Sequence, residues 1–120
     1  MLFSKPAAPP DPLAALFNPR SVALIGATDK PGKVGCALLR NLAFGSRVGT
    51  SRDTGFKGKV YPVNPRGGEM CGLKVFPSVL EITDEVDYAV IALAPAAIPE
   101  VVEKCGVKGV KAISIISGGF

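Results

Sequence analysis

The feature that most constrains the fold of this chain is an alternation of short, continuous apolar runs with segments of helical spacing. The apolar runs cover residues 21–26, 59–63, 87–93 and 112–117. Continuous runs of this length are typical of strands that are buried on both faces, as in parallel sheets. Pro62 lies inside the second run, which indicates that this strand is ending there or lies at a sheet edge.

Helical spacing separates these runs. Residues 32–43 and 98–105 each gather their apolar side chains on one face, and Glu100 and Lys104 are predicted to pair on the polar face of the later helix. Gly106 is expected to end that helix. Residues 77–82 are a shorter helix candidate that starts with proline, where a missing N–H is tolerated.

The order strand, helix, strand, helix, strand, helix, strand predicts an α/β fold with a Rossmann-like, doubly wound parallel sheet. A length of 120 residues suits a single domain, expected over residues 12–120 after a flexible Pro- and Ala-rich leader at 1–11. Residues 46–54 are polar and without periodicity, and are predicted to form a surface insertion. Ligands of such folds bind beyond the carboxyl ends of the strands.

Composition narrows the setting. The chain has no apolar run of about 18 residues and no signal-peptide pattern, so a cytoplasmic protein is expected, with neither membrane nor nucleic acid as a partner. Cys36, Cys71 and Cys105 are widely spaced and are predicted to be reduced, half-buried apolar residues. Residues 1–74 carry 11 Lys and Arg against 4 Asp and Glu, whereas residues 75–120 carry 3 against 6. The positive charge of the first part favours an anionic ligand.

The strongest local signal is the segment IGATDKPGKVG at 25–35, which joins the first predicted strand to the first predicted helix. Unpaired N–H groups and the positive end of the helix dipole make such a junction an anion site. Gly26 and Gly32 would let the backbone approach a phosphate, Lys30 and Lys33 add charge, and Thr28 adds a hydroxyl. A purely structural role for these residues, in close packing or as solvated charges, is the competing interpretation.

The same loop argues against a plain NAD site. Five residues separate Gly26 from Gly32, whereas the dinucleotide fingerprint has a single-residue gap at its start. The turn after the second strand reads Val63, Asn64, Pro65 and Arg66, without the acid that would bind a ribose hydroxyl. Arg66 suits an extra phosphate on the ribose, which both NADP and coenzyme A carry. Spacing alone leaves these two cofactors open.

Several blocks in order, FNPRSVALIGATDKPGKVG, FKGKVYPVNPR, GLKVFPSVLEI and DEVDYAVIALAPAAIPEVVEKCGVKGVKAISIISGGF, resemble one family. It is the coenzyme A-binding domain of nucleoside-diphosphate-forming acyl-CoA synthetases, namely the ADP-forming acetyl-CoA synthetases and, more distantly, the alpha subunit of succinyl-CoA synthetase. The resemblance implies that coenzyme A is the cofactor. By position it implies the following cofactor-binding residues: Gly26, Thr28, Asp29, Lys30, Pro31, Gly32 and Lys33; Val63, Asn64, Pro65 and Arg66; Ala94, Pro95 and Ala96; and Ile116, Ser117 and Gly118.

The resemblance also implies partners, since family members combine this domain with a phosphohistidine domain and an ATP-grasp domain. The chain has no histidine, so it is expected to bind the cofactor without catalysing the reaction. No catalytic residue and no metal-ligand cluster is predicted. A stand-alone or regulatory coenzyme A-binding protein, or the NADP-binding half of a reductase, are the alternatives.

Overall fold

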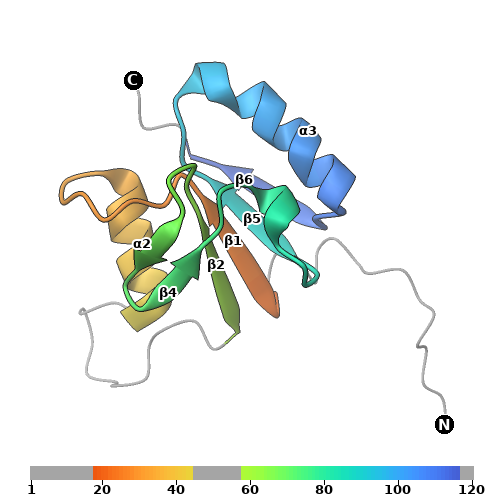
Figure 1. Cartoon of the computed structure of the whole chain (residues 1–120). Helices are drawn as coiled ribbons and strands as arrows, with labels where there is room; N and C mark the ends of the chain where they lie inside the picture. Colours follow the sequence, from red (N-terminus) through yellow and green to blue (C-terminus); the bar gives the residue numbers. More distant parts are fainter. Residues whose placement is uncertain (1–17, 45–57, 117–120) are drawn as a thin grey trace, which may run out of the picture.

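A computed structural model of the chain describes residues 18–44 and 58–116. Its centre is a four-stranded parallel sheet in the order β2-β1-β5-β6, made of β1 (Ser21–Ile25), β2 (Lys59–Val63), β5 (Tyr88–Ile91) and β6 (Ala112–Ile115) (Figure 1). The predicted α/β, Rossmann-like fold is confirmed. The bounds of β2 agree with the prediction, and Pro62 does lie in an edge strand.

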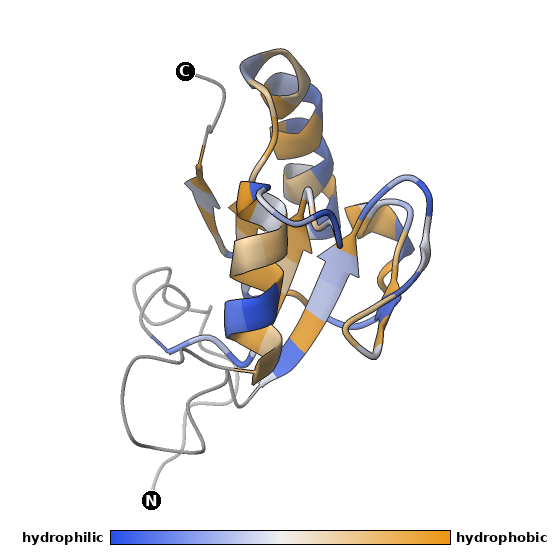
Figure 2. Cartoon of the chain, turned by 90° about the vertical axis from the view of Figure 1, so that its left-hand side faces the viewer, coloured by the Kyte–Doolittle hydropathy of each residue, from blue (hydrophilic) through white to orange (hydrophobic). Residues whose placement is uncertain are grey.

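Each face of the sheet carries its own core. On one face, α3 (Ile98–Lys108) and the 3-10 turn η1 (Val79–Glu81) cover a cluster that includes Ile25, Val63 and Ile91. On the other face, α2 (Val34–Phe44) covers Val22, Leu24 and Val90. Figure 2 shows hydrophobic residues along the central strands, and hydrophobic and hydrophilic residues that alternate along both helices. All five residues of β1 are buried because both faces are covered, which explains its continuous apolar run.

The helix ends differ from the prediction. α2 begins at Val34, two residues after the expected start, because Gly32 has a φ of 87° and cannot belong to the helix. The prediction that Gly106 ends α3 is wrong. The helix continues to Lys108, and Gly109, with a φ of 88°, caps it by donating its N–H to the carbonyls of Cys105 and Gly106. The predicted apolar face of α3 is confirmed, as is the pair of Glu100 and Lys104 at 3.3 Å.

The segment between β2 and β5 contains a hairpin that the sequence analysis missed. β3 (Gly68–Met70) and β4 (Leu73–Val75) pair antiparallel, and Phe76 then bridges to Val63 at the edge of β2. The helix predicted at 77–82 shrinks to the three residues of η1, which begins after Ser78 rather than at Pro77. The Ser78 hydroxyl accepts a hydrogen bond from the N–H of Leu80 and so fixes this start.

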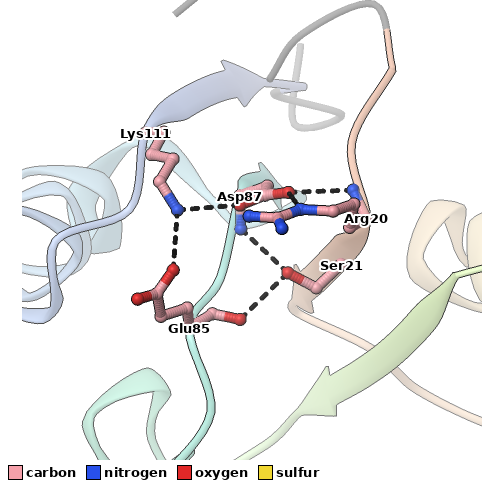
Figure 3. Close-up of polar contacts among 5 residues, drawn as sticks. All are labelled: Arg20, Ser21, Glu85, Asp87 and Lys111. Atoms are coloured by element: carbon pink, nitrogen blue, oxygen red, sulfur yellow. Dashed lines mark hydrogen bonds and ion pairs between the residues drawn. The ribbon is translucent and has the colours of Figure 1, made fainter. Parts of the chain in front are cut away.

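The amino ends of β1, β5 and β6 are joined by a polar network (Figure 3). The buried carboxylate of Asp87 accepts hydrogen bonds from the Arg20 backbone N–H at 2.9 Å and the Lys111 ammonium at 2.9 Å. The Ser21 hydroxyl donates to the Glu85 carbonyl and accepts from the Asp87 N–H. Burial alone would raise the pKa of Asp87, but its donors Lys111 and Arg20 outweigh burial and hold the pKa at about 2. These acidic residues therefore have a structural task at the edge opposite the predicted ligand site.

Other sequence-based predictions meet the structure unevenly. All three cysteines are free, but the prediction that they are half-buried holds only for Cys71, because Cys36 and Cys105 lie on the inner faces of α2 and α3 and are buried. The leader at 1–11 and the insertion at 46–54 lie outside the described residues, as do Ser117 and Gly118. Among the described residues, no helix is long and apolar enough to cross a membrane, and no group of three potential metal ligands occurs.

Candidate functional site

The predicted site segments meet at the carboxyl edge of the sheet. The loop after β1, the turn after β2, the turn η2 (Pro95–Ala97) after β5 and Ile116 after β6 all follow parallel strands. Their common edge is therefore set by the topology (Figure 1).

Close backbone contact at this edge depends on Gly26 and Gly35. A Cβ on Gly26 would lie 2.2 Å from the carbonyl oxygen of Ala92, and a Cβ on Gly35 would lie 2.1 Å from the carbonyl oxygen of Gly26. A Cβ on Gly32 would meet nothing within 4 Å. The two roles considered for the loop glycines are thus divided: Gly26 lets the end of β1 pack against the backbone that follows β5, whereas Gly32 faces open space. The sequence analysis missed Gly35 as a packing residue. A glycine near the start of a helix is unfavourable for the helix itself, and this could have indicated a close contact there.

The packing of Gly35 against Gly26 brings the amino end of α2 to the sheet edge. The Lys33 carbonyl accepts from the N–H groups of Cys36 and Ala37, at 3.1 and 3.2 Å, which makes Lys33 the last residue before the helix. The first N–H groups of a helix have no acceptor inside it and attract anions. A surface pocket of about 240 Å³ opens here, lined by Gly26, Thr28, Lys33, Val34, Gly35, Ala92, Leu93, Ala94 and Ile116.

Asn64 joins the turn after β2 to the loop after β1. Its side-chain amide donates to the carbonyl of Ala27 at 2.8 Å, and its side-chain oxygen accepts from the N–H of Arg66 at 2.9 Å. Its backbone N–H also donates to the carbonyl of Phe76. Asn64 therefore holds three segments of the site together, a role that its sequence position alone did not reveal.

A second, larger pocket of about 430 Å³ lies at the same edge on the α3 side. Its walls are mostly apolar, and it shares Gly26 and Leu93 with the pocket at α2. It takes in the predicted residues Val63, Asn64 and Pro65, together with residues that were not predicted, among them Ser78, Val101, Glu100 and Lys104. Ser78 caps η1 and the other three lie on α3, so their part in the site depends on how these elements pack, for which the sequence carried no signal.

The remaining predicted residues line neither pocket. Asp29, Lys30, Pro31 and Gly32 form the exposed outer part of the loop, and Arg66 is exposed on the turn after β2. Pro95 and Ala96 belong to η2 at the same edge. The Thr28 hydroxyl accepts from the N–H of Lys30 at 3.2 Å and so shapes the loop. The described part of the predicted site thus lies along one edge of the sheet, but only some of its residues line the two pockets.

A doubly wound parallel sheet, with an exposed helix amino end and paired pockets at its carboxyl edge, defines a nucleotide-binding domain of the Rossmann class. Residues 20–120 match the family described as CoA binding domain, and the chain belongs to that family. The resemblance inferred from the sequence is therefore confirmed, and coenzyme A is the cofactor of the family.

Similar proteins place this domain inside larger chains. The chain is 52% identical to the alpha subunit of acetate–CoA ligase (ADP-forming) I from Pyrococcus furiosus, over 90% of this chain and 22% of that protein. It matches the structure of an acetyl-coenzyme A synthetase 1 from Ca. Korarchaeum cryptofilum, in complex with phosphate and ADP, with a TM-score of 0.76 and 42% identity, over 90% of this chain and 21% of that one. The chain thus spans about a fifth of the length of these relatives.

A shorter structural relative is a conserved hypothetical protein from Pyrococcus furiosus. It matches with a TM-score of 0.67 and 31% identity, over 84% of this chain and 78% of that one. The fold therefore also occurs in a chain not much longer than the domain.

Proposed function

We propose that the carboxyl edge of the sheet binds coenzyme A across its two pockets. The observation that carries the proposal is that Gly26 and Leu93 line both pockets, which makes the two pockets neighbours. Coenzyme A has a nucleoside at one end, a pyrophosphate in the middle and an extended pantetheine arm. The apolar 430 Å³ pocket has the size of a small-molecule site and suits the adenosine.

The other parts of the cofactor find matching chemistry at the 240 Å³ pocket. The amino end of α2 suits the pyrophosphate, with Lys33 in the pocket lining. Lys30 in the same loop and Arg66 on the turn after β2 add exposed positive charge at this edge of the sheet. Ile116, 38% exposed, offers an apolar surface to the pantetheine arm. Ser117 and Gly118 continue the chain from Ile116 and belong to the same proposed segment.

In the proposed whole protein, this domain serves an ADP-forming acyl-CoA synthetase, which converts an acid, coenzyme A and ATP into acyl-CoA, ADP and phosphate. The names of the longer relatives support this activity. The chain itself has no histidine, so the phosphohistidine and the nucleotide-grasping domain would come from elsewhere in the assembly. We place this protein in the cytoplasm, in keeping with its three free cysteines.

Isothermal titration calorimetry with coenzyme A and, in parallel, NADPH tests the proposed ligand. We expect coenzyme A to bind in the micromolar range or more weakly, at most about 8 kcal/mol, because one open domain covers the ligand from one side only. Heat with NADPH and none with coenzyme A would overturn the proposal.

A stand-alone coenzyme A-binding protein is the second candidate, supported by the short relative of which the chain covers 78%. The mass of the native protein separates the candidates, because a synthetase subunit of the size of the longer relatives is several times heavier than this chain. Coupled synthesis of acyl-CoA and ADP by the native protein would exclude the second candidate.

A further inference from the structure

The two pockets differ in the cations that reach them. Among the described residues, Lys33 is the cation that lines the pocket at α2, and Lys104 is the cation that lines the larger pocket. Arg66, which follows the second strand and is the expected partner of a ribose phosphate, lines neither. If the larger pocket takes the adenosine of coenzyme A, the cation at its wall is on α3.

We infer that Lys104 recognises the 3′-phosphate of coenzyme A and thereby selects it against nucleotides without a phosphate on the ribose. The inference rests on the proposed binding of coenzyme A. The pocket walls supply the setting: Pro65, Leu93 and Val101 offer apolar surface to a base, while Asn64, Ser78, Glu100 and Lys104 are polar. A phosphorylated nucleoside needs this mixture, an apolar wall for the base and a cation for the phosphate.

Lys104 is free enough to change partner. Its side chain is 40% exposed, and its ammonium lies 3.3 Å from the carboxylate of Glu100, which is 74% exposed. A surface pair at i,i+4 is worth only a few tenths of a kcal/mol, so a phosphate dianion can displace the carboxylate, which then turns into solvent. Glu100 holds Lys104 at the pocket when no ligand is bound and competes weakly when one is.

Because Glu100 competes with the phosphate for Lys104, loss of the Glu100 charge is expected to strengthen coenzyme A binding rather than weaken it. Replacing Glu100 with Gln removes a negative charge from the pocket wall and frees Lys104 from its competitor. We therefore expect Glu100→Gln to bind coenzyme A about twofold more tightly, and 3′-dephospho-coenzyme A as before.

The test compares the ratio of affinities for coenzyme A and 3′-dephospho-coenzyme A in Lys104→Met and Arg66→Met of the 120-residue chain. Met keeps the apolar stem and removes the charge, and each variant is the matched control of the other. We expect Lys104→Met to weaken coenzyme A binding about tenfold and leave the dephospho form unchanged, which would collapse the ratio. Arg66→Met should change the ratio little. Circular dichroism and thermal melting check that both variants fold.

Two other results would overturn the inference. One is a ratio that collapses in Arg66→Met and survives in Lys104→Met, which would assign the phosphate to the turn after β2. The other is a wild-type chain that binds both ligands equally. That result would agree with coenzyme A as the cofactor, but it would show that the chain does not recognise the 3′-phosphate. Absence of coenzyme A binding in the wild type is a separate result, and it would overturn the proposed function together with the inference.

Discussion

Gly26 and Gly32 lie six positions apart in one loop, yet they meet different physical demands. Both have a positive φ, 101° and 87°, which L side chains rarely adopt. Only at Gly26 is the space for a side chain already filled, by the backbone of Ala92. A side chain would strain the backbone at both positions, but it would clash with neighbouring atoms only at Gly26.

Alanine at these two positions should therefore separate folding from binding. Gly32→Ala should cost about 1 kcal/mol of unfolding free energy, from backbone strain alone, and should weaken coenzyme A binding because the Cβ lies on the open side of the loop. Gly26→Ala should cost well over about 3 kcal/mol, because the ends of β1 and β5 must also move apart at Ala92. Urea denaturation with calorimetry of the folded variant measures both effects. Equal stability losses would contradict the assignment of Gly26 to packing.

At the scale of elements, the turn after β2 is held to the loop after β1 through one side chain, Asn64. Asn64→Ala removes the hydrogen bonds to Ala27 and Arg66, so we expect a loss of about 2 kcal/mol in unfolding free energy and weaker coenzyme A binding. Asn64→Asp keeps the acceptor for the Arg66 N–H but sets a carboxylate against the Ala27 carbonyl, and should be at least as harmful. Full stability and binding in Asn64→Asp would show that the link to Ala27 is not needed.

A second link between elements, the Asp87 network, should appear in the pH dependence of stability. The pKa of Asp87 is about 2 in the folded chain, below the value of about 3.9 for an unfolded aspartate. The stabilisation from Asp87 is therefore complete above about pH 5 and is lost as the pH falls through about 4 towards 2, and it amounts to about 2 to 3 kcal/mol. Asp87→Asn should lower stability at neutral pH, since Lys111, whose side chain is 14% exposed, loses its buried partner and keeps only the exposed Glu85.

Denaturant unfolding at a series of pH values from 7 to about 2 measures this contribution. Because other carboxylates titrate in the same range, the quantity to compare is the difference between the wild type and Asp87→Asn. That difference should shrink as the pH falls below about 4. A difference independent of pH would show that the network stabilises through packing rather than charge.

The elements differ in how far the sequence could predict them. The strands were predictable within about two residues, because burial on both faces leaves a continuous apolar run. The hairpin of β3 and β4 was not, because each strand has three residues and the turn between them puts Cys71 at a φ of 53°, where Asn or Gly is the usual signal. The larger pocket was hidden for another reason: Ser78 and Lys104 meet at it only through the packing of η1 and α3 on the sheet.

On the scale of the whole molecule, the two edges of the sheet differ in how far their charged side chains form salt bridges. At the amino edge, cations and carboxylates pair with one another: Lys111 with Asp87 and Glu85, Arg20 with Asp87, and Lys59 with Asp84 at 3.7 Å. Among the described residues, none of the salt bridges involves Lys30, Lys33 or Arg66 at the carboxyl edge. The positive charges of Lys30, Lys33 and Arg66 thus lie where an anionic ligand would approach.

Charge reversal at the two edges should separate position from net charge. Lys33→Glu and Lys59→Glu change the net charge equally, but Lys59 begins β2, roughly 13 Å from its carboxyl end. A glutamate at 33 lies at the amino end of α2, where the helix dipole favours it, so that variant should fold while it repels the cofactor. At 0.1 M salt, dissolved ions screen charges that lie more than about 10 Å apart. Only Lys33→Glu should therefore make coenzyme A affinity fall less steeply as the salt concentration rises. Titrations between about 0.05 and 0.5 M salt compare the slopes. Matching slopes for the two variants would mean that affinity follows net charge and that the edge itself gives no local attraction.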